Sequence, residues 1–266
     1  MKGLTAGIIG CGNMGGAIAR GMVKKGIAPP RSILLNDKDE TKAARLAEET
    51  GCTREELLSL VRASDLLVIA VKPQDFEGLF GDISGDIKGQ TIISVMAGVR
   101  ISAITARLGR DVPVVRAMPN MAALVAESIT CISCNNMVKV TGEIKDIFAG
   151  IGKVLEVDES FLDGVTALSG SGPAYLFYLA EAMIDAGVEM GFEGDTVKEL
   201  VVQTLYGSAA LMRDAESLPA ELIRKVASKG GTTEAALAVF DEKGMKSVIK
   251  TAIAEAKKRS EELSRG

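Results

Sequence analysis

The fold is decided near the start of the chain by the stretch Ala6-Gly7-Ile8-Ile9-Gly10-Cys11-Gly12-Asn13-Met14-Gly15-Gly16-Ala17-Ile18-Ala19. A short apolar run, typical of a buried strand, meets glycines spaced G-x-G-x-x-G and then continues with helical periodicity. In this pattern the first glycine permits a tight turn, the second lets the backbone approach a pyrophosphate, and the third lets helix pack on strand. The stretch therefore predicts a dinucleotide site at a helix N-terminus, where free N–H groups and the helix dipole favour an anion.

The composition is that of a globular protein long enough for two domains. The chain has 266 residues, 47% of them hydrophobic and 25% charged, and a net charge of −4. This acidic balance argues against a nucleic-acid partner, because the one basic cluster, at residues 257–259, is flanked by acidic residues. The first residues run directly into the predicted strand, so we expect no signal peptide and a cytoplasmic location.

Histidine is absent from the sequence, which excludes any mechanism that needs an imidazole acid, base or metal ligand. The four cysteines are too few and too scattered for a disulfide framework. Cys131 and Cys134 form a C-x-x-C, but they lie in a strand-like run with no second pair, so we expect no metal site. Cys11, near a helix N-terminus, is interpreted as a small side chain that fills the glycine turn rather than as a reactive thiol.

Strand and helix signals alternate up to residue 158. Apolar runs predict strands at 32–36, 65–71, 91–98, 112–120, 128–133 and 153–157, with helical periodicity at 40–49, 55–62 and 141–150. The alternation predicts an α/β fold whose N-terminal domain, residues 1–158, is a Rossmann-type doubly wound sheet. Ligands bind beyond the carboxyl ends of such strands. We therefore expect the coenzyme to contact the glycine loop and the next turns: Gly10, Cys11, Gly12, Asn13, Met14, Gly15, Ala70, Val71, Lys72, Pro73, Met96 and Ala97.

The end of the second predicted strand is where a dinucleotide fold meets the adenosine ribose. An acidic residue there binds the 2′-hydroxyl of NAD, whereas a small polar residue with a nearby cation accepts the 2′-phosphate of NADP. Asn36 and Lys38 suit the phosphate, while Asp37 suits the hydroxyl. The sequence favours NADP(H) over NAD(H) and leaves both open.

After residue 158 strand-like runs disappear and long helical periodicities begin, which predicts an all-helical domain over residues 159–266. Helices are expected at 174–191, 195–213, 220–225 and 245–263, the first starting in the capping sequence at 169–173. The first helix is apolar, but Glu181, Asp185 and Glu189 make a membrane span too costly. We therefore expect no membrane-spanning segment.

A second glycine-rich loop, Ser228-Lys229-Gly230-Gly231-Thr232-Thr233, lies in this helical half. Two glycines and two threonines that open a helix offer a row of backbone N–H groups together with hydroxyl donors. The loop is either a second anion-binding site or an ordinary capped helix start.

Four stretches, in this order along the chain, resemble the pyrroline-5-carboxylate reductase family: residues 7–15, 71–74, 167–175 and 228–233. Arg116-Ala117-Met118-Pro119-Asn120 resembles the nicotinamide-side loop of that family, which implies coenzyme contacts from Met118, Pro119 and Asn120. The resemblance implies reduction of 1-pyrroline-5-carboxylate to proline with NAD(P)H. It also implies that the helical domain is a dimerisation domain, in a homodimer or a ring of dimers.

The resemblance further implies roles for single residues. Thr233 would be the catalytic residue, offering its hydroxyl to the imine nitrogen, while Ser228, Gly231 and Thr232 would hold the substrate carboxylate and Glu159 would lie on the substrate side. The chain departs from the family pattern at several positions. Lys229, in place of a proline, bears most on function because it lies within the loop that would hold the substrate carboxylate.

Three other functions remain open. A β-hydroxyacid dehydrogenase shares the architecture but uses a lysine on the helix where this chain has Tyr175-Leu176-Phe177-Tyr178. A deazaflavin-linked NADP reductase shares the first domain only. A non-catalytic dinucleotide sensor would have no use for a second anion loop.

Overall fold

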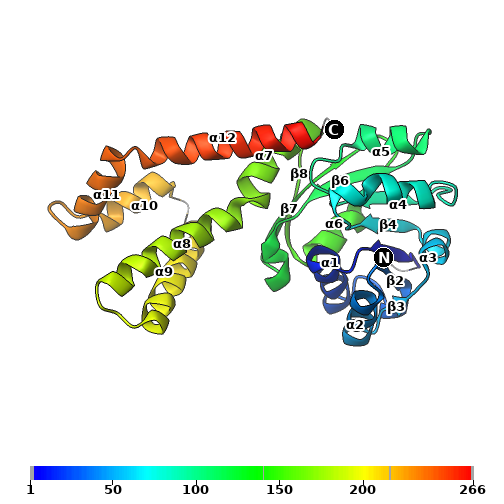
Figure 1. Cartoon of the computed structure of the whole chain (residues 1–266), viewed down its shortest axis with the longest axis horizontal. Helices are drawn as coiled ribbons and strands as arrows, with labels where there is room; N and C mark the ends of the chain where they lie inside the picture. Colours follow the sequence, from blue (N-terminus) through cyan, green and yellow to red (C-terminus); the bar gives the residue numbers. More distant parts are fainter. Residues whose placement is uncertain (1–2, 140, 216, 265–266) are drawn as a thin grey trace. The chain divides into compact units, whose positions relative to one another are not determined.

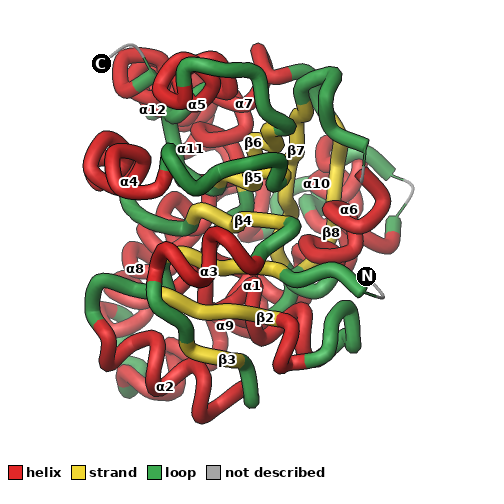
Figure 2. Tube along the Cα trace, turned by 90° about the vertical axis from the view of Figure 1, so that its right-hand side faces the viewer, coloured by secondary structure: helices red, strands yellow, loops and turns green. Residues whose placement is uncertain are grey.

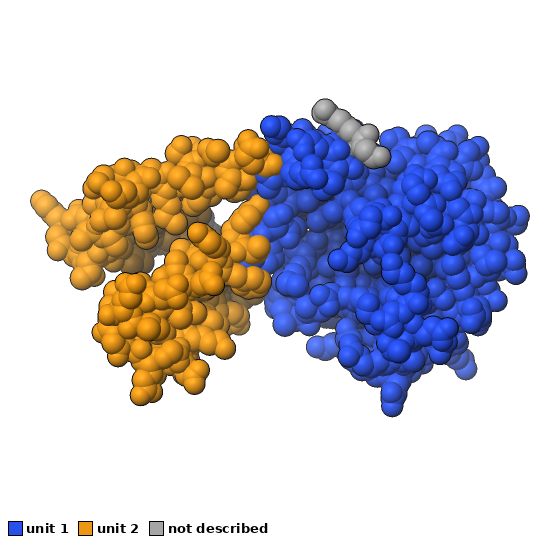
Figure 3. Space-filling model, in the orientation of Figure 1, with its two compact units in different colours: residues 1–173, 256–266 blue, residues 174–255 orange. Residues whose placement is uncertain are grey.

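The computed structural model describes residues 3–139, 141–215 and 217–264. The chain forms two compact units (Figure 3). Unit 1 consists of residues 1–173 and 256–266, and unit 2 consists of residues 174–255.

Unit 1 is built on a sheet with the strand order β3-β2-β1-β4-β5-β6-β7-β8 (Figure 2). Neighbouring strands are parallel, except that β6 and β7 are antiparallel. The strands are β1 (Ala6–Ile9), β2 (Ile33–Asn36), β3 (Thr53–Arg54), β4 (Leu66–Ile69), β5 (Thr91–Ser94), β6 (Val114–Met118), β7 (Ser128–Cys134) and β8 (Gly152–Glu156).

Helices connect these strands (Figure 1). They are α1 (Asn13–Lys24), α2 (Glu40–Thr50), α3 (Leu57–Ala63), α4 (Phe76–Ile83), α5 (Ile101–Leu108) and α6 (Thr141–Ala149), and a further helix, α7 (Leu162–Val165), follows β8. Short 3-10 turns lie at η1 (Pro30–Ser32), η2 (Pro73–Asp75), η3 (Met121–Val125) and η4 (Glu159–Phe161).

The sheet has a core on each face, and β4 shows how alternate residues feed both. Leu66 and Val68 pack into a cluster with residues of α1, α2 and α6. Leu67 and Ile69 pack into a second cluster with residues of α3, α4 and α5. A strand buried on both faces reads as a continuous apolar run, which is why the sequence pattern predicted this strand. The predicted doubly wound α/β domain is confirmed.

Local structure departs from the prediction ahead of the long helix of unit 2. The segment 169–173 is predicted to start a helix, but helical turns begin already at α7, which continues into a π-helical turn, η5 (Thr166–Gly170). There the Ser171 N–H donates to the Thr166 carbonyl at 2.8 Å, and α8 then begins at Gly172. Pro173 has no N–H to continue the ladder, so it falls in the first turn of the new helix, where none is needed.

Within the described residues, the regular secondary structure of unit 2 consists of helices, as predicted (Figure 1). Its elements are α8 (Gly172–Glu189), α9 (Gly194–Asp214), α10 (Pro219–Val226), α11 (Thr232–Glu242) and α12 (Met245–Leu263), of which α8 starts and α12 ends in unit 1. Of the helices in the described part of the chain, none is both long and apolar enough to cross a lipid bilayer. The predicted boundary between residues 158 and 159 stays a prediction; β8 ends just before it.

Few side chains of unit 2 are buried within the single chain. Val197 and Val201 on α9 are buried, and Val197 lies so close to Gly187 of α8 that a side chain at Gly187 would collide with it. Large apolar side chains are instead exposed along its helices, among them Phe177, Tyr178, Met190, Tyr206, Val226 and Val248. An apolar surface of this extent is typical of an interface with another chain.

Candidate functional site

The first glycine of the loop after β1 lies close to the backbone that ends β2 and to the backbone that follows β4. Gly10 has a φ of +99°, a conformation that side chains rarely adopt, and its N–H donates to the Asn36 carbonyl at 2.8 Å. A Cβ at this position would lie 2.6 Å from the carbonyl oxygen of Ala70. Glycine is therefore required here by both the backbone angle and the close approach of the segment after β4.

The other two glycines meet the requirements of a pyrophosphate cradle. A Cβ added at Gly12 would meet nothing within 4 Å, so the backbone there is open to a ligand, whereas a Cβ at Gly15 would collide with the Gly10 carbonyl. Among the described residues, no side chain caps the N-terminus of α1 and no acidic residue lies in its first turn. Asn13 and Met14 begin this helix, so the geometry fits an anion bound at its N-terminus.

Cys11, between the first two glycines, is buried and donates its backbone N–H to Asp37 Oδ2 at 2.7 Å. Its Sγ lies 3.5 Å from the Asn36 carbonyl oxygen. Burial, with the neighbouring Asp37 carboxylate, raises the pKa of the Cys11 thiol to about 12. The side chain is therefore a neutral thiol at physiological pH, in agreement with its interpretation as a filler of the turn.

The two residues expected to favour a 2′-phosphate both bind groups of the chain itself. Asn36 Nδ2 donates to the Glu55 carbonyl at 2.9 Å. Lys38 Nζ, on an exposed side chain, pairs with Asp75 Oδ1 at 2.8 Å. The structure thus places both side chains at the carboxyl end of β2, as expected, but with protein partners.

The turns after β4 and β5 lie at the same edge of the sheet as the glycine loop, because these strands are parallel to β1. Ala70 and Val71 are half-buried there, and Lys72 and Pro73 are exposed. The side chain of Met96 is buried in the core, whereas Ala97 is half-exposed.

The predicted nicotinamide-side loop contacts the π-helical turn. Asn120 Nδ2 lies 3.1 Å from Ser169 Oγ, and the Asn120 N–H donates to Ser128 Oγ at 3.1 Å. Any side chain at Gly170 would meet the end of Met118 at 2.5 Å. Pro119, between these contacts, is buried. Two motifs that lie about fifty residues apart in sequence are thereby held together within unit 1.

A buried charge cluster lies beside this loop. Arg116 on β6 pairs with Asp163 at 3.3 Å, and the two side chains are 4% and 6% exposed. Asp163 also accepts from Ser260 Oγ of α12 at 2.8 Å. Burial opposes ionisation of Asp163, but the Ser260 hydroxyl and Arg116 outweigh it and lower its pKa. The sequence analysis missed this cluster; the available signal was a single arginine inside an apolar strand.

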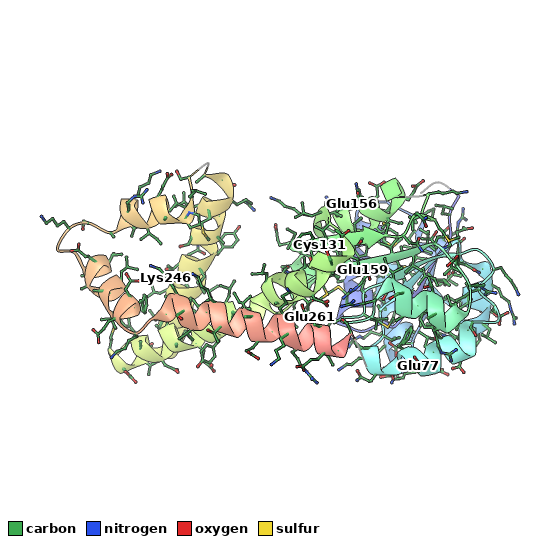
Figure 4. All side chains as sticks on the ribbon, turned by 90° about the horizontal axis from the view of Figure 1, so that it is seen from above. Glu77, Cys131, Glu156, Glu159, Lys246 and Glu261 are labelled. Atoms are coloured by element: carbon green, nitrogen blue, oxygen red, sulfur yellow. The ribbon has the colours of Figure 1, made fainter. Side chains whose placement is uncertain are left out.

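Glu159, which is labelled in Figure 4, belongs to the same cluster through its contact with Arg116. Its Oε1 accepts from the Ile101 N–H at 2.8 Å and lies 3.4 Å from Arg116 Nη1. These contacts give the Glu159 carboxylate partners at the first residue of α5 and on β6.

The second glycine-rich loop lies in unit 2 and precedes α11. Gly230 has a φ of +74°, and the Gly231 N–H donates to the Ser228 carbonyl at 3.0 Å. No side chain caps α11 in the described structure, and Thr232 and Thr233 form its first turn. The Gly230 N–H donates to Glu234 Oε2 at 2.6 Å, a contact that the sequence analysis missed.

Two family profiles match the chain. The profile described as pyrroline-5-carboxylate reductase dimerisation matches residues 159–263. The profile described as NADP oxidoreductase, coenzyme F420-dependent, matches residues 5–98, which lie in the first predicted domain.

Curated relatives match over nearly the full length. The pyrroline-5-carboxylate reductase of Mycobacterium leprae is 36% identical, covering 96% of this chain and 95% of the relative, and that of Synechocystis is 35% identical, covering 98% and 99%. Among solved structures, the pyrroline carboxylate reductase of Plasmodium falciparum with NADP bound superposes with a TM-score of 0.89 at 28% identity, covering 99% of each chain. The enzyme from Coxiella burnetii gives 0.90 at 29% identity, covering 98% of each. The chain belongs to the pyrroline-5-carboxylate reductase family.

Proposed function

We propose that this chain reduces the C=N bond of 1-pyrroline-5-carboxylate with a reduced nicotinamide dinucleotide, giving L-proline. The observation that carries the proposal is full-length similarity to enzymes of that name, with both glycine-rich loops present. When the protein is mixed with the imine acid and the reduced coenzyme, the coenzyme is expected to be consumed. The absorbance of the reduced nicotinamide measures this consumption. A folded protein that binds the coenzyme but leaves the imine acid unreduced would contradict the proposal.

A nicotinamide dinucleotide supplies the hydride when it is bound. The chain would hold it with the Gly10–Gly15 loop, Lys72 and Pro73 after β4, and the Met118–Asn120 loop. Because positioning of two reactants can lower a barrier by ~7–11 kcal/mol, a substrate that enters as the iminium needs no strong acid from the protein. This requirement suits a chain without histidine.

The Ser228–Thr233 loop is the proposed substrate site. The backbone N–H groups at Gly231 and Thr232, with the Ser228 hydroxyl, would hold the substrate carboxylate at the start of α11, where the helix dipole favours an anion. Thr233, in the first turn, would donate its hydroxyl to the imine nitrogen. Glu159 would lie on the substrate side, with its carboxylate held by the Ile101 N–H and by Arg116.

Replacing Thr233 with alanine is expected to lower kcat/KM by the equivalent of ~1–3 kcal/mol, because one polar partner of the substrate is left unpaired. Steady-state kinetics measures this loss. Thr233→Ser, which keeps the hydroxyl, is expected to retain most of the activity. Equal kcat/KM for wild type and Thr233→Ala would remove Thr233 from the mechanism.

Homodimerisation, or assembly into a ring of dimers, is proposed as the state in which the exposed apolar helices of unit 2 become covered. The dimerisation profile over residues 159–263 and the exposed side chains of α8, α9 and α12 support it. Light scattering is expected to give a molar mass of at least two chains. A monomer at micromolar concentration would contradict this proposal. The four free cysteines suit the cytoplasmic location that we also propose.

A further inference from the structure

The residue that follows β2 is held against the glycine loop by two hydrogen bonds. Asp37 Oδ2 accepts from the Cys11 N–H at 2.7 Å, and Asp37 Oδ1 accepts from the Asp39 N–H at 2.8 Å. Each oxygen has its own backbone donor, so the carboxylate is fixed in orientation. Because Cys11 lies between Gly10 and Gly12, the charge sits on the loop proposed to hold the coenzyme.

Two cations close to the end of β2 are paired with acidic groups. Lys38 pairs with Asp75 at 2.8 Å, and Arg54 of β3 pairs with Glu40. The other polar side chain at the end of β2, Asn36, donates to the Glu55 carbonyl. Asn36 and Lys38, the side chains expected to bind a 2′-phosphate, are therefore bonded to other groups of the protein. The oxygens of the Asp37 carboxylate can still accept further hydrogen bonds.

We infer that Asp37 makes this chain select NADH over NADPH. A carboxylate at the end of β2 can accept a hydrogen bond from the ribose 2′-hydroxyl, whereas a 2′-phosphate brings like charge and no donor. The Cys11 N–H donates to Asp37 and is therefore not available to a phosphate oxygen. The inference rests on the proposed binding of a nicotinamide dinucleotide, and it departs from the NADP(H) preference that the sequence favoured.

The test is a set of dissociation constants measured by isothermal titration calorimetry with NADH and NADPH, in the absence of substrate. Wild type is expected to bind NADH more tightly than NADPH by about tenfold or more. Asp37→Ser removes the charge and releases the Cys11 N–H, and it is expected to reduce this ratio about tenfold, mainly by tightening NADPH. Asp82→Ser, the same substitution at an exposed position on α4, is expected to leave the ratio unchanged.

If the wild type binds NADPH more tightly than NADH, the inference is overturned. This comparison uses the wild-type protein alone, so it does not depend on whether a variant folds. An unchanged ratio in Asp37→Ser with an unchanged unfolding midpoint would also overturn it. The proposed reductase activity is tested separately: a protein that prefers NADH in calorimetry yet leaves 1-pyrroline-5-carboxylate unreduced would contradict the proposed function while upholding the role of Asp37.

Discussion

Arg116→Met is expected to lower the free energy of unfolding by about 3 kcal/mol, because it leaves the buried Asp163 without its buried cationic partner. Breaking one side of a buried pair costs ~3–5 kcal/mol, and the lower end applies since Ser260 and Arg100 remain beside the carboxylate. Urea denaturation followed by circular dichroism measures the change. Asp163 also accepts a hydrogen bond from Ser260, near the end of α12. The backbone amides of α12 around Ser260 should therefore lose protection from hydrogen exchange as well.

The matched control is Arg107→Met, which breaks an ion pair at the surface. Arg107 pairs with Glu77 at 2.8 Å, and the Glu77 side chain is 73% exposed (Figure 4). Surface pairs contribute ~0–1 kcal/mol, so this variant should lose less than a third of what Arg116→Met loses. Equal losses in the two variants would show that the buried cluster does not hold unit 1 together.

Substitutions at Gly12 and Gly15 are expected to have different effects, one on coenzyme affinity and the other on the stability of the fold. Gly15→Ala forces a side chain against the backbone carbonyl of Gly10, which has little room to move, and should destabilise the protein by up to ~3 kcal/mol. Gly12→Ala meets open space and keeps an extended backbone, so stability should change by less than ~0.5 kcal/mol. Its methyl group nevertheless occupies the space through which a pyrophosphate approaches, and dinucleotide affinity should fall about tenfold or more.

Calorimetry with NADH and thermal unfolding of the same samples measure both effects. Gly85→Ala serves as the control, because a Cβ there also meets nothing within 4 Å and the position lies away from the loop, after α4. Full dinucleotide affinity in Gly12→Ala would contradict the placement of the pyrophosphate at the start of α1.

Much of the fold follows from local sequence patterns. The apolar run of β4 is buried on both faces, and periodicity places α9 and α12 within one or two residues of their observed ends. Elements too short to show a hydrophobic periodicity were not predicted. One is β3, which spans two residues, and another is the π-helical turn before α8, whose position depends on where α7 begins.

The site was predicted less completely, because its polar contacts join residues far apart in sequence. The sequence allows Asp37 to be compared with Asn36 and Lys38 by residue type alone, whereas the bond that holds Asp37 reaches back to Cys11. The partners of Arg116 and Asp163 are set by tertiary packing, with Ser260 almost a hundred residues from Asp163. No local pattern encodes such contacts, so the sequence identified the loops but not the bonds that fix them.

We propose above that this chain transfers a hydride from a reduced dinucleotide to the imine carbon of 1-pyrroline-5-carboxylate, and that both glycine-rich loops are needed for it. The most direct test uses a reduced dinucleotide with deuterium in place of both hydrogens on its hydride-donating carbon and follows the label by mass spectrometry. The account predicts one deuterium in each proline formed, at rates that fall in both Gly12→Ala and Thr233→Ala. Proline without deuterium, or no proline from a folded protein that binds both the dinucleotide and the imine acid, would contradict it.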